Sequence, residues 1–217
     1  MASVNRGGGG GGGGGAIQIY ATGSVTVSGT ITAAGGNGGN GYTLGGDGSG
    51  AGGGGSGGAI LLQSGNAAAS GTLTTAGGAA GTSNGSAAGG AGGTGRIRID
   101  GLATGTTIST IAGTAGSRFI GPVIDTLVDT TVKGRADGGS TVTLYVYDGT
   151  GAQVSGSPYI TSASGSSNTV GTWTISNVTF PSGIGFLAVK QTTGSAQVLG
   201  PGRATRGLHL TNWREVY

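Results

Sequence analysis

The stretch GGGGGGGGGAIQIYATGSVTVSGTITAAGG, residues 7–36, decides the fold of the first half of the chain. Nine glycines lead without a break into short segments in which apolar and polar residues alternate. Ile17 and Ile19 face one side, and Gln18 and Tyr20 face the other. This period of two predicts short β-strands separated by tight corners at glycines, and it argues against helix.

The pattern repeats along the first half of the chain. GGAIQIYATGSVTVSGTITAAGG begins at Gly14, GGAILLQSGNAAASGTLTTAGG at Gly57 and GTGRIRIDGLATGTTISTIAGTAG at Gly93, so the copies are 43 and 36 residues apart. Each copy holds an apolar strand, a small-residue segment and a strand of the type GTI or GTL. Three copies at this spacing predict stacked repeats, either a parallel β-solenoid or a small stacked sheet.

Glycine-rich segments, residues 35–58 and 77–95, separate the copies. They are either flexible loops or extended strands of the polyproline II type that pack side by side. Loops of this length are rare in compact domains, and glycine lets backbones approach closely. We therefore expect ordered, polyglycine-II-like packing that includes Gly7–Gly15. A valine at Gly53 is expected to disrupt it.

Composition divides the chain into two domains. Of the 56 glycines among 217 residues, 42 precede residue 122, whereas all four prolines and both tryptophans follow Gly121. We expect a glycine-rich β-repeat domain over residues 1–121 and a second domain over residues 122–217. The overall fold class is expected to be all-β.

Charge and residue usage exclude several functional classes. The net charge of +3 comes from ten cations and seven anions without a basic cluster, so we expect no nucleic-acid partner. Without cysteine there is no disulfide, thiolate or zinc cluster. No apolar run is long enough for membrane insertion. The start MASVNR lacks the apolar core of a secretion signal, and we expect the chain to be part of a longer protein.

The segments GSGGAILLQ, GTLTTAGG and GGAGGTGRIRID, within residues 55–100, resemble glycine-rich repeats of very large bacterial surface proteins. The resemblance covers residues 7–116 and implies an extracellular scaffold. A weaker similarity connects the chain with the distal tail-fibre adhesins of T-even-like phages, in which packed glycine helices present variable loops. Glycine-rich antifreeze proteins share only the glycine content.

The second half has strands at the spacing of a two-sheet sandwich. We expect strands at residues 131–137, 140–151, 171–178 and 183–192, with Asp148-Gly149-Thr150-Gly151 as a hairpin turn. The combination VKGRADGGSTVTLY with GTWTI resembles bacterial Ig-like domains over residues 122–217. The resemblance implies a core tryptophan, Trp173, packed with four apolar side chains, those of Val132, Val142, Leu144 and Leu187.

The end of the chain, GPGRATRGLHLTNWREVY, departs from the usual ending of such domains. Leu208, Leu210 and Val216 fit a last strand. Trp213 and Tyr217 either close the sandwich, which we favour, or belong to an interface.

No catalytic, cofactor-binding or metal-binding residue is assigned, and no enzymatic activity or cofactor is expected. His209 alternates with two leucines and fits an exposed strand position. Four aspartates, at positions 125, 129, 137 and 148, fit turns better than a calcium site. Arg96 and Arg98 are expected to face solvent together. The sequons at Asn84 and Asn177 are expected to be silent in a bacterial or phage protein.

We therefore expect a non-enzymatic extracellular structural protein of a surface fibre or filament, with an adhesive role toward a cell-surface or glycan receptor. The alternatives are a phage tail-fibre adhesin, located on the virion, and an ice-binding protein with threonines stacked in TITA, TLTT and TIST. Self-association is expected through free strand edges at Ile17–Ile19 and Thr107–Ile111. Residues 1–6 are expected to be free to add to a neighbouring sheet.

Overall fold

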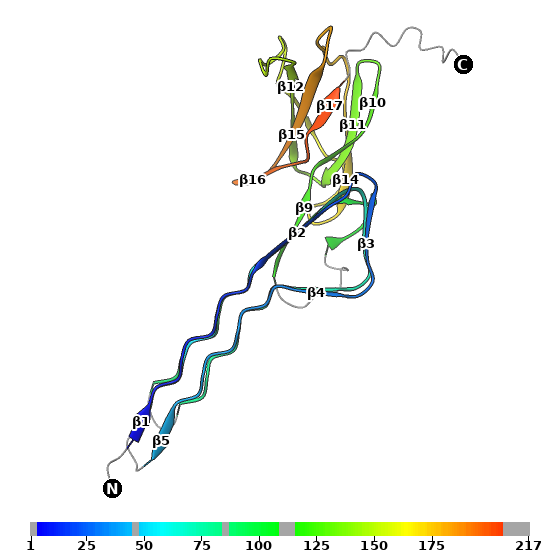
Figure 1. The fold of residues 1–217 in the computed structure, drawn as a ribbon. Helices are drawn as coiled ribbons and strands as arrows, with labels where there is room; N and C mark the ends of the chain where they lie inside the picture. Colours follow the sequence, from blue (N-terminus) through cyan, green and yellow to red (C-terminus); the bar gives the residue numbers. More distant parts are fainter. Residues whose placement is uncertain (1–3, 45–47, 84–86, 109–115, 206–217) are drawn as a thin grey trace, which may run out of the picture.

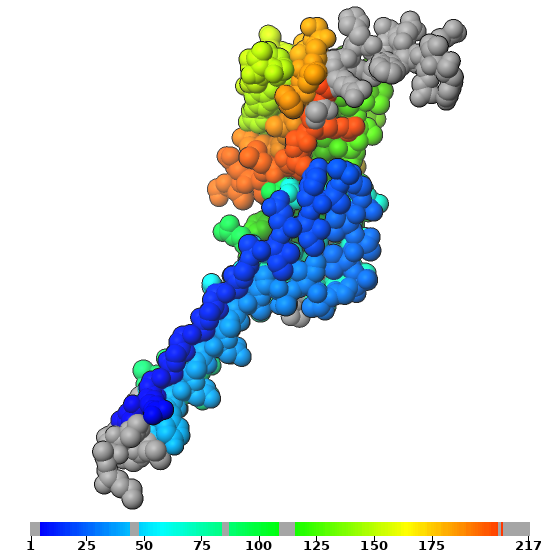
Figure 2. All heavy atoms as spheres, viewed as in Figure 1, coloured from blue at the N-terminus to red at the C-terminus, as the bar shows by residue number. Residues whose placement is uncertain are grey.

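The structure of the chain is a computed structural model that describes residues 4–44, 48–83, 87–108 and 116–205. These residues form strands, turns and extended segments with almost no helix, which confirms the all-β prediction. A long thin rod of extended segments leads into one set of strands, and a second set lies beyond it (Figure 1). The rod is narrow from surface to surface, as the space-filling view in Figure 2 shows.

A parallel sheet forms the centre of the first half. Its strand order is β2 (Ala16–Tyr20), β6 (Ala59–Ala69), β8 (Arg96–Leu102) and β9 (Ser117–Gly121). Ala16 lies opposite Ala59, and Ala59 lies opposite Arg96, so the copies are offset by 43 and 37 residues. The expected second offset of 36 is one residue short, because the strand of the third copy begins one residue later than the motif alignment implies.

Two shorter strands continue the stacking. Strand β3 (Ser24–Val27) pairs in parallel with the second part of β6, and β4 (Thr30–Thr32) pairs in parallel with β7 (Thr72–Thr74). The predicted alternation is confirmed, since Ile17 and Ile19 of β2 pack against the core while Gln18 and Tyr20 are exposed. The buried apolar side chains of this core are Val25, Val27, Ala33, Ile60, Leu62, Ala67, Leu73, Ile97, Ile99, Leu102, Ile108, Ile120 and Val170.

Five glycine-rich segments run side by side along the rod. We name them tract 1 (residues 7–15), tract 2 (35–41), tract 3 (50–58), tract 4 (77–83) and tract 5 (87–95). Because tracts 1, 3 and 5 lead directly into β2, β6 and β8, the parallel register of the sheet continues into the rod.

Backbone hydrogen bonds join the tracts at every third residue. The amides of Gly8, Gly11 and Gly14 donate to carbonyl oxygens of tract 3 at 2.7–3.0 Å. Tract 2 runs antiparallel to tract 1, and Gly36 and Gly39 donate to it at 2.7 Å. The same interval recurs at residues 35, 38 and 41; 52, 55 and 58; 51, 54 and 57; 78 and 81; and 92 and 95. Repeated bonding between backbones offsets the entropy lost in ordering glycine.

Close packing forbids side chains at the inward positions. A Cβ at Gly52 would lie 2.0 Å from the carbonyl oxygen of Gly9, and one at Gly54 would lie 2.0 Å from that of Gly78. At Gly53 the nearest atom, the carbonyl oxygen of Gly90, is 3.4 Å away, which is ordinary contact. The expected sensitivity of Gly53 is therefore wrong, because the three-residue period turns this position away from neighbouring backbones.

A small two-stranded sheet closes the far end of the rod. Strand β1 (Val4–Arg6) pairs antiparallel with β5 (Tyr42–Leu44), with Asn5 opposite Thr43. Val4–Arg6 are therefore not the free segment that the sequence predicts, because they already pair with β5 along one edge. Their other edge has no strand partner among the described residues.

Two antiparallel sheets form the second half. One sheet has the order β10 (Val123–Val128), β11 (Thr131–Asp137) and β14 (Val170–Ile175). The other has the order β13 (Tyr159–Ser162), β12 (Thr141–Asp148), β15 (Gly185–Thr193) and β16 (Ala196–Leu199), and β17 (Arg203–Thr205) also pairs with β15.

Apolar side chains from both sheets meet in one core around Trp173. This residue is 2 % exposed, and its indole N–H donates to the carbonyl oxygen of Arg135. Its predicted neighbours belong to the same buried cluster, namely Val132, Val142, Leu144 and Leu187. The prediction of a tryptophan-centred core is confirmed at the level of burial.

The predicted turn at residues 148–151 is confirmed. The side-chain oxygen Oδ1 of Asp148 accepts from the backbone amides of Thr150 and Ala152 and from the Thr150 hydroxyl. Gly151 has a φ of +87°, a conformation that favours glycine. Strand β12 ends at Asp148, so the strand expected over residues 140–151 is shorter than predicted.

The chain changes sheets at Pro122, between β9 and β10. The end of the third copy also turns toward the second half, where Thr107 bridges Thr169 and the Ile108 amide donates to Asn168. The expected free edge at Thr107–Ile111 is therefore wrong at Thr107 and Ile108, because these residues contact the second half. Residues 109–111 lie outside the described residues, as do Leu208, His209, Leu210, Trp213, Val216 and Tyr217.

Candidate functional site

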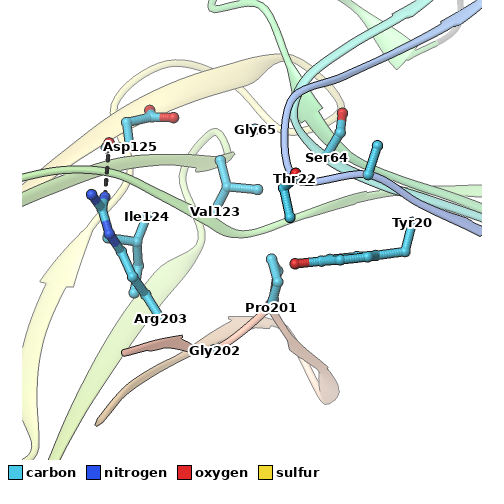
Figure 3. Close-up of a pocket in the computed structure, with 11 residues that line it drawn as sticks. Tyr20, Thr22, Ser64, Gly65, Val123, Ile124, Asp125, Pro201, Gly202 and Arg203 are labelled. Carbon is cyan, nitrogen blue, oxygen red and sulfur yellow. Dashed lines mark hydrogen bonds between the residues drawn. The ribbon is translucent and has the colours of Figure 1, made fainter. Parts of the chain in front are cut away.

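A groove of about 370 Å³ lies between the two halves of the chain. Figure 3 shows the Tyr20 ring extending along it toward Pro201. Tyr20 is the last residue of β2 and is 62 % exposed. The remaining wall is formed by Ala21, Thr22, Ser64, Gly65, Val123, Ile124, Asp125, Gly202 and Arg203. The groove thus offers an open aromatic face, an apolar floor and charged side chains, a combination suited to an amphipathic ligand.

An arginine cluster holds the charged wall in place. The Arg135 guanidinium contacts both carboxylate oxygens of Asp125, at 2.8 Å from Nε and 2.6 Å from Nη2. Arg203 donates to the backbone oxygen of Asp125 at 3.0 Å. The pairing with Arg135 is bidentate, the geometry in which arginine fixes a carboxylate most firmly.

Arg135 also joins the two halves of the chain. Its Nη1 donates to the carbonyl oxygens of Gly101 and Leu102, at 3.0 and 2.5 Å, and its Nη2 donates to that of Gly65 at 2.6 Å. Since Arg135 belongs to β11 and the acceptors belong to β6 and β8, one side chain sets the position of the groove's opposite walls.

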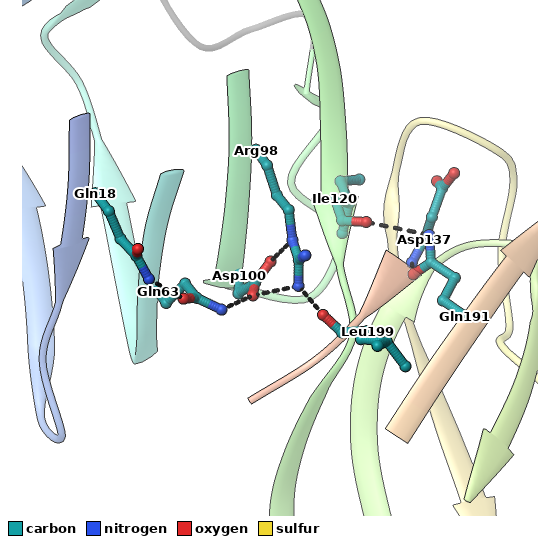
Figure 4. A network of polar contacts seen from close by, with 8 residues as sticks. All are labelled: Gln18, Gln63, Arg98, Asp100, Ile120, Asp137, Gln191 and Leu199. Atoms are coloured by element: carbon teal, nitrogen blue, oxygen red, sulfur yellow. Dashed lines mark hydrogen bonds and ion pairs between the residues drawn. The ribbon is translucent and has the colours of Figure 1, made fainter. Parts of the chain in front are cut away.

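A row of polar side chains crosses the parallel sheet beside the groove (Figure 4). Gln18 donates to Gln63 at 3.0 Å, and Gln63 donates to Asp100 at 2.9 Å. Arg98 contacts both carboxylate oxygens of Asp100 at 2.7 Å and donates to the Leu199 carbonyl oxygen. The row therefore links the edge strand β2 with β16 of the second half.

Asp100 is fully buried within this row. Burial raises the pKa of Asp100 above its ordinary value, while the Arg98 guanidinium and the Gln63 amide oppose the rise. The expectation that Arg98 faces solvent beside Arg96 is wrong, because Arg98 turns to neutralise this buried carboxylate.

A second polar contact between the halves involves Gln191 of β15. Its side-chain amide donates to the Ile120 carbonyl oxygen at 3.1 Å, and its Oε1 accepts from the Asp137 amide at 2.9 Å. The Asp137 carboxylate accepts from the Asn168 amide at 2.6 Å, and burial raises the pKa of Asp137. Asp137 thus has a structural role beside the junction.

The four aspartates considered for calcium do not converge. Asp125 pairs with Arg135, Asp137 lies at the junction, and Asp148 organises its own turn, where bonds from Thr150 lower the pKa of its carboxyl. Asp129 adopts a φ of 51° at the turn between β10 and β11. Within the described ranges, no group of three or more His, Cys, Asp or Glu side chains is arranged to hold a metal ion.

Among the described residues, the threonines considered for ice binding form two ranks, and Thr110 of the third copy lies outside these residues. Thr30 lies opposite Thr72, and Thr32 lies opposite Thr74, in the β4–β7 pair. Thr107 of the third copy instead bridges Thr169 in the second half. The sequon at Asn84 lies outside the described residues, and Asn177 has a φ of 59° in a loop.

Sequence reasoning did not find the groove. Its walls come from four separate segments, and only the packing of the two halves brings them together. The sequence feature that could have indicated the groove is Tyr20, which the alternation of β2 places on the exposed face.

No family model, curated protein or solved structure matches the chain. Among the described residues, no helix is long and apolar enough to cross a membrane.

Proposed function

We propose that the chain is a non-enzymatic extracellular structural protein, a subunit of a surface fibre or filament with an adhesive role. In this proposal, packed polyglycine II helices form a stiff rod, and a glycine-rich β-solenoid connects the rod to an Ig-like sandwich. The bacterial surface repeats and Ig-like domains that the sequence resembles serve as scaffold and spacer modules.

The period-three hydrogen bonding between the glycine tracts is the observation that supports this proposal most. Glycine at positions such as Gly52 and Gly54 is needed only if other backbones lie within contact distance. Such a rod holds its two ends apart at a fixed distance without a hydrophobic core. Separation of this kind is useful in a fibre subunit, and it has no evident use in a catalytic domain.

The finer parts of the fold are supported by register and burial. Parallel pairing at offsets of 43 and 37 residues agrees with a solenoid of three stacked copies. Two antiparallel sheets around the buried Trp173 agree with an Ig-like sandwich.

The groove supports a second candidate, a receptor-binding adhesin that sits on a virion or a cell surface. The exposed Tyr20 ring, with Asp125 and Arg203 nearby, offers an apolar face together with hydrogen-bonding groups. A glycan receptor presents the matching chemistry, because a sugar ring has apolar faces and hydroxyl edges.

Negative-stain electron microscopy and light scattering of the purified chain test the structural function. We expect elongated assemblies whose size increases with protein concentration. A monodisperse monomer at the highest concentrations would contradict the fibre-subunit proposal and leave the adhesin candidate.

A further inference from the structure

We propose that the outer edge of tract 1 is the contact through which a second copy of this chain binds, with the two tracts antiparallel. The inference rests on the proposed function, because it names the surface through which the subunits associate. The surface that binds there is the same edge of tract 1 in another copy.

Unused backbone groups are the first observation. Gly8, Gly11 and Gly14 donate to tract 3, but the amides of Gly10 and Gly13 make no backbone hydrogen bond within the described part of the chain. The carbonyl oxygens of Gly9 and Gly12 face tract 2, so in the same trans peptides these two N–H groups point to the opposite flank. The tract also has unused carbonyl oxygens, since only those of residues 9, 12 and 15 accept such bonds. The edge therefore presents donors and acceptors together, as a self-complementary contact requires.

Glycine at positions with free space is the second observation. A Cβ at Gly9, Gly12 or Gly15 would meet nothing within 4 Å. Packing within one chain therefore does not explain glycine there. Outward positions of other tracts hold the side chains of Asn37, Asn40, Ala79, Thr82, Ala88, Ala91 and Thr94, and in tract 5 these alternate with the open glycines Gly90 and Gly93. Tract 1 is the one tract made of glycine alone, and close approach of another backbone explains this composition.

An antiparallel contact of this kind already exists inside the molecule. Gly36 and Gly39 of tract 2 donate to the carbonyl oxygens of Gly12 and Gly9, each at 2.7 Å. The proposed contact repeats this geometry on the opposite flank of tract 1, which Figure 2 shows as an outer strand of the rod.

The free edge continues beyond the glycines into β2. Gly15 accepts from Ala59 and Ala21 donates to Gln63, so the alternation of a parallel ladder turns the backbone groups of Gln18 away from β6. With a two-fold axis near Gly11, β1 of the second copy lies beside this edge. With a rise of about 3.1 Å per residue, the same axis places the two Arg6 residues about 30 Å apart. Their charges therefore do not oppose the contact.

Matched double substitutions test the contact. Gly9→Val with Gly12→Val fills the proposed interface, and Gly90→Val with Gly93→Val fills equally open positions on tract 5. We expect both variants to be at least as stable to heat as wild type, because a side chain at an open position restricts only the unfolded chain. In analytical ultracentrifugation, the tract 1 variant should self-associate at least tenfold more weakly, whereas the tract 5 variant should match wild type.

Three outcomes overturn the proposal. Wild-type association of the tract 1 variant, or an equal loss in both variants, would exclude this edge and leave the fibre function standing. A wild-type chain that remains monomeric would overturn both the edge and the fibre function.

A cysteine variant gives a readout even if the valines impair folding. The chain has no cysteine, so a single introduced thiol crosslinks only between copies. With the axis near Gly11, residue 12 of each copy lies about 6 Å from its counterpart along the tract, and the spacing between neighbouring tracts adds to this, so a short bifunctional maleimide spans the two thiols. With this reagent, Gly12→Cys should crosslink at least tenfold faster than Gly93→Cys, and equal rates would refute the contact.

Discussion

Asp100 positions Arg98, which contacts Leu199 of the second half, and the protonation of its carboxylate depends on pH. Burial raises its pKa above the ordinary value of 3.8, so the folded chain keeps a proton that the unfolded chain releases. Stability is therefore expected to fall as pH rises from about 3.8 through the raised pKa of Asp100. Asp100→Asn should make this part of the profile flatter in urea unfolding between pH 3.5 and 7.

In the Asp100→Asn variant, the free energy of unfolding is still expected to depend on pH. Burial also raises the pKa of Asp137, which acts in the same direction, whereas the lowered pKa of Asp148 acts in the opposite one. An unchanged profile in the variant would show that Asp100 does not titrate differently in the two states.

At the scale of the element, neighbouring glycines of one tract can differ sharply in the space around them. A Cβ at Gly92 would lie 1.9 Å from the Gly55 carbonyl oxygen, whereas one at Gly93 would meet nothing within 4 Å. Gly92→Ala should lower the free energy of unfolding by about 2–4 kcal/mol through overpacking. Gly93→Ala should raise it by about 0.4–1 kcal/mol, because alanine restricts the unfolded chain.

Thermal or urea unfolding of these two neighbours measures the difference directly. Equal effects in both variants would mean that the tract does not pack as described. In a flexible linker either alanine would have little effect on the folded state. Changes of opposite sign in the free energy of unfolding at adjacent positions are therefore not expected there.

The elements were largely predictable, and their contacts were not. Alternation predicted the faces of β2, and the resemblance to bacterial Ig-like domains predicted the burial of Trp173. The spacing of hydrogen-bonded positions along a glycine tract has no such signal, because Gly52 to Gly55 are the same residue. The expectation for Gly53 was wrong for this reason.

Contacts between the halves were missed for a related reason. Arg98 looked like a surface residue in an alternating strand, and only the neighbouring β16 and the buried Asp100 give it partners. Thr107 matched its repeat but bridges Thr169 instead. Local pattern predicts which face a side chain takes, whereas partners from distant segments depend on the packing of whole sheets.

At the scale of the whole molecule, the side chains of Arg98, Arg135 and Gln191 and the backbone bridge between Thr107 and Thr169 join the halves. Arg135 reaches β6 and β8, and Gln191 reaches Ile120 of β9. The rod extends away from this junction and ends at the β1–β5 pair (Figure 1). A proposed fibre subunit therefore has a fixed junction at one end and an open glycine edge along the rod.

Residue-resolved amide hydrogen exchange measured by NMR tests whether the glycine tracts form an ordered, hydrogen-bonded rod. Tract 3 is the most informative, because it lies between the other tracts. We expect strong protection of the bonded amides of Gly52, Gly54 and Gly55, with faster exchange at Gly53, whose amide donates to no backbone acceptor among the described residues. Exchange of all four amides at the rate of a free peptide would contradict an ordered rod.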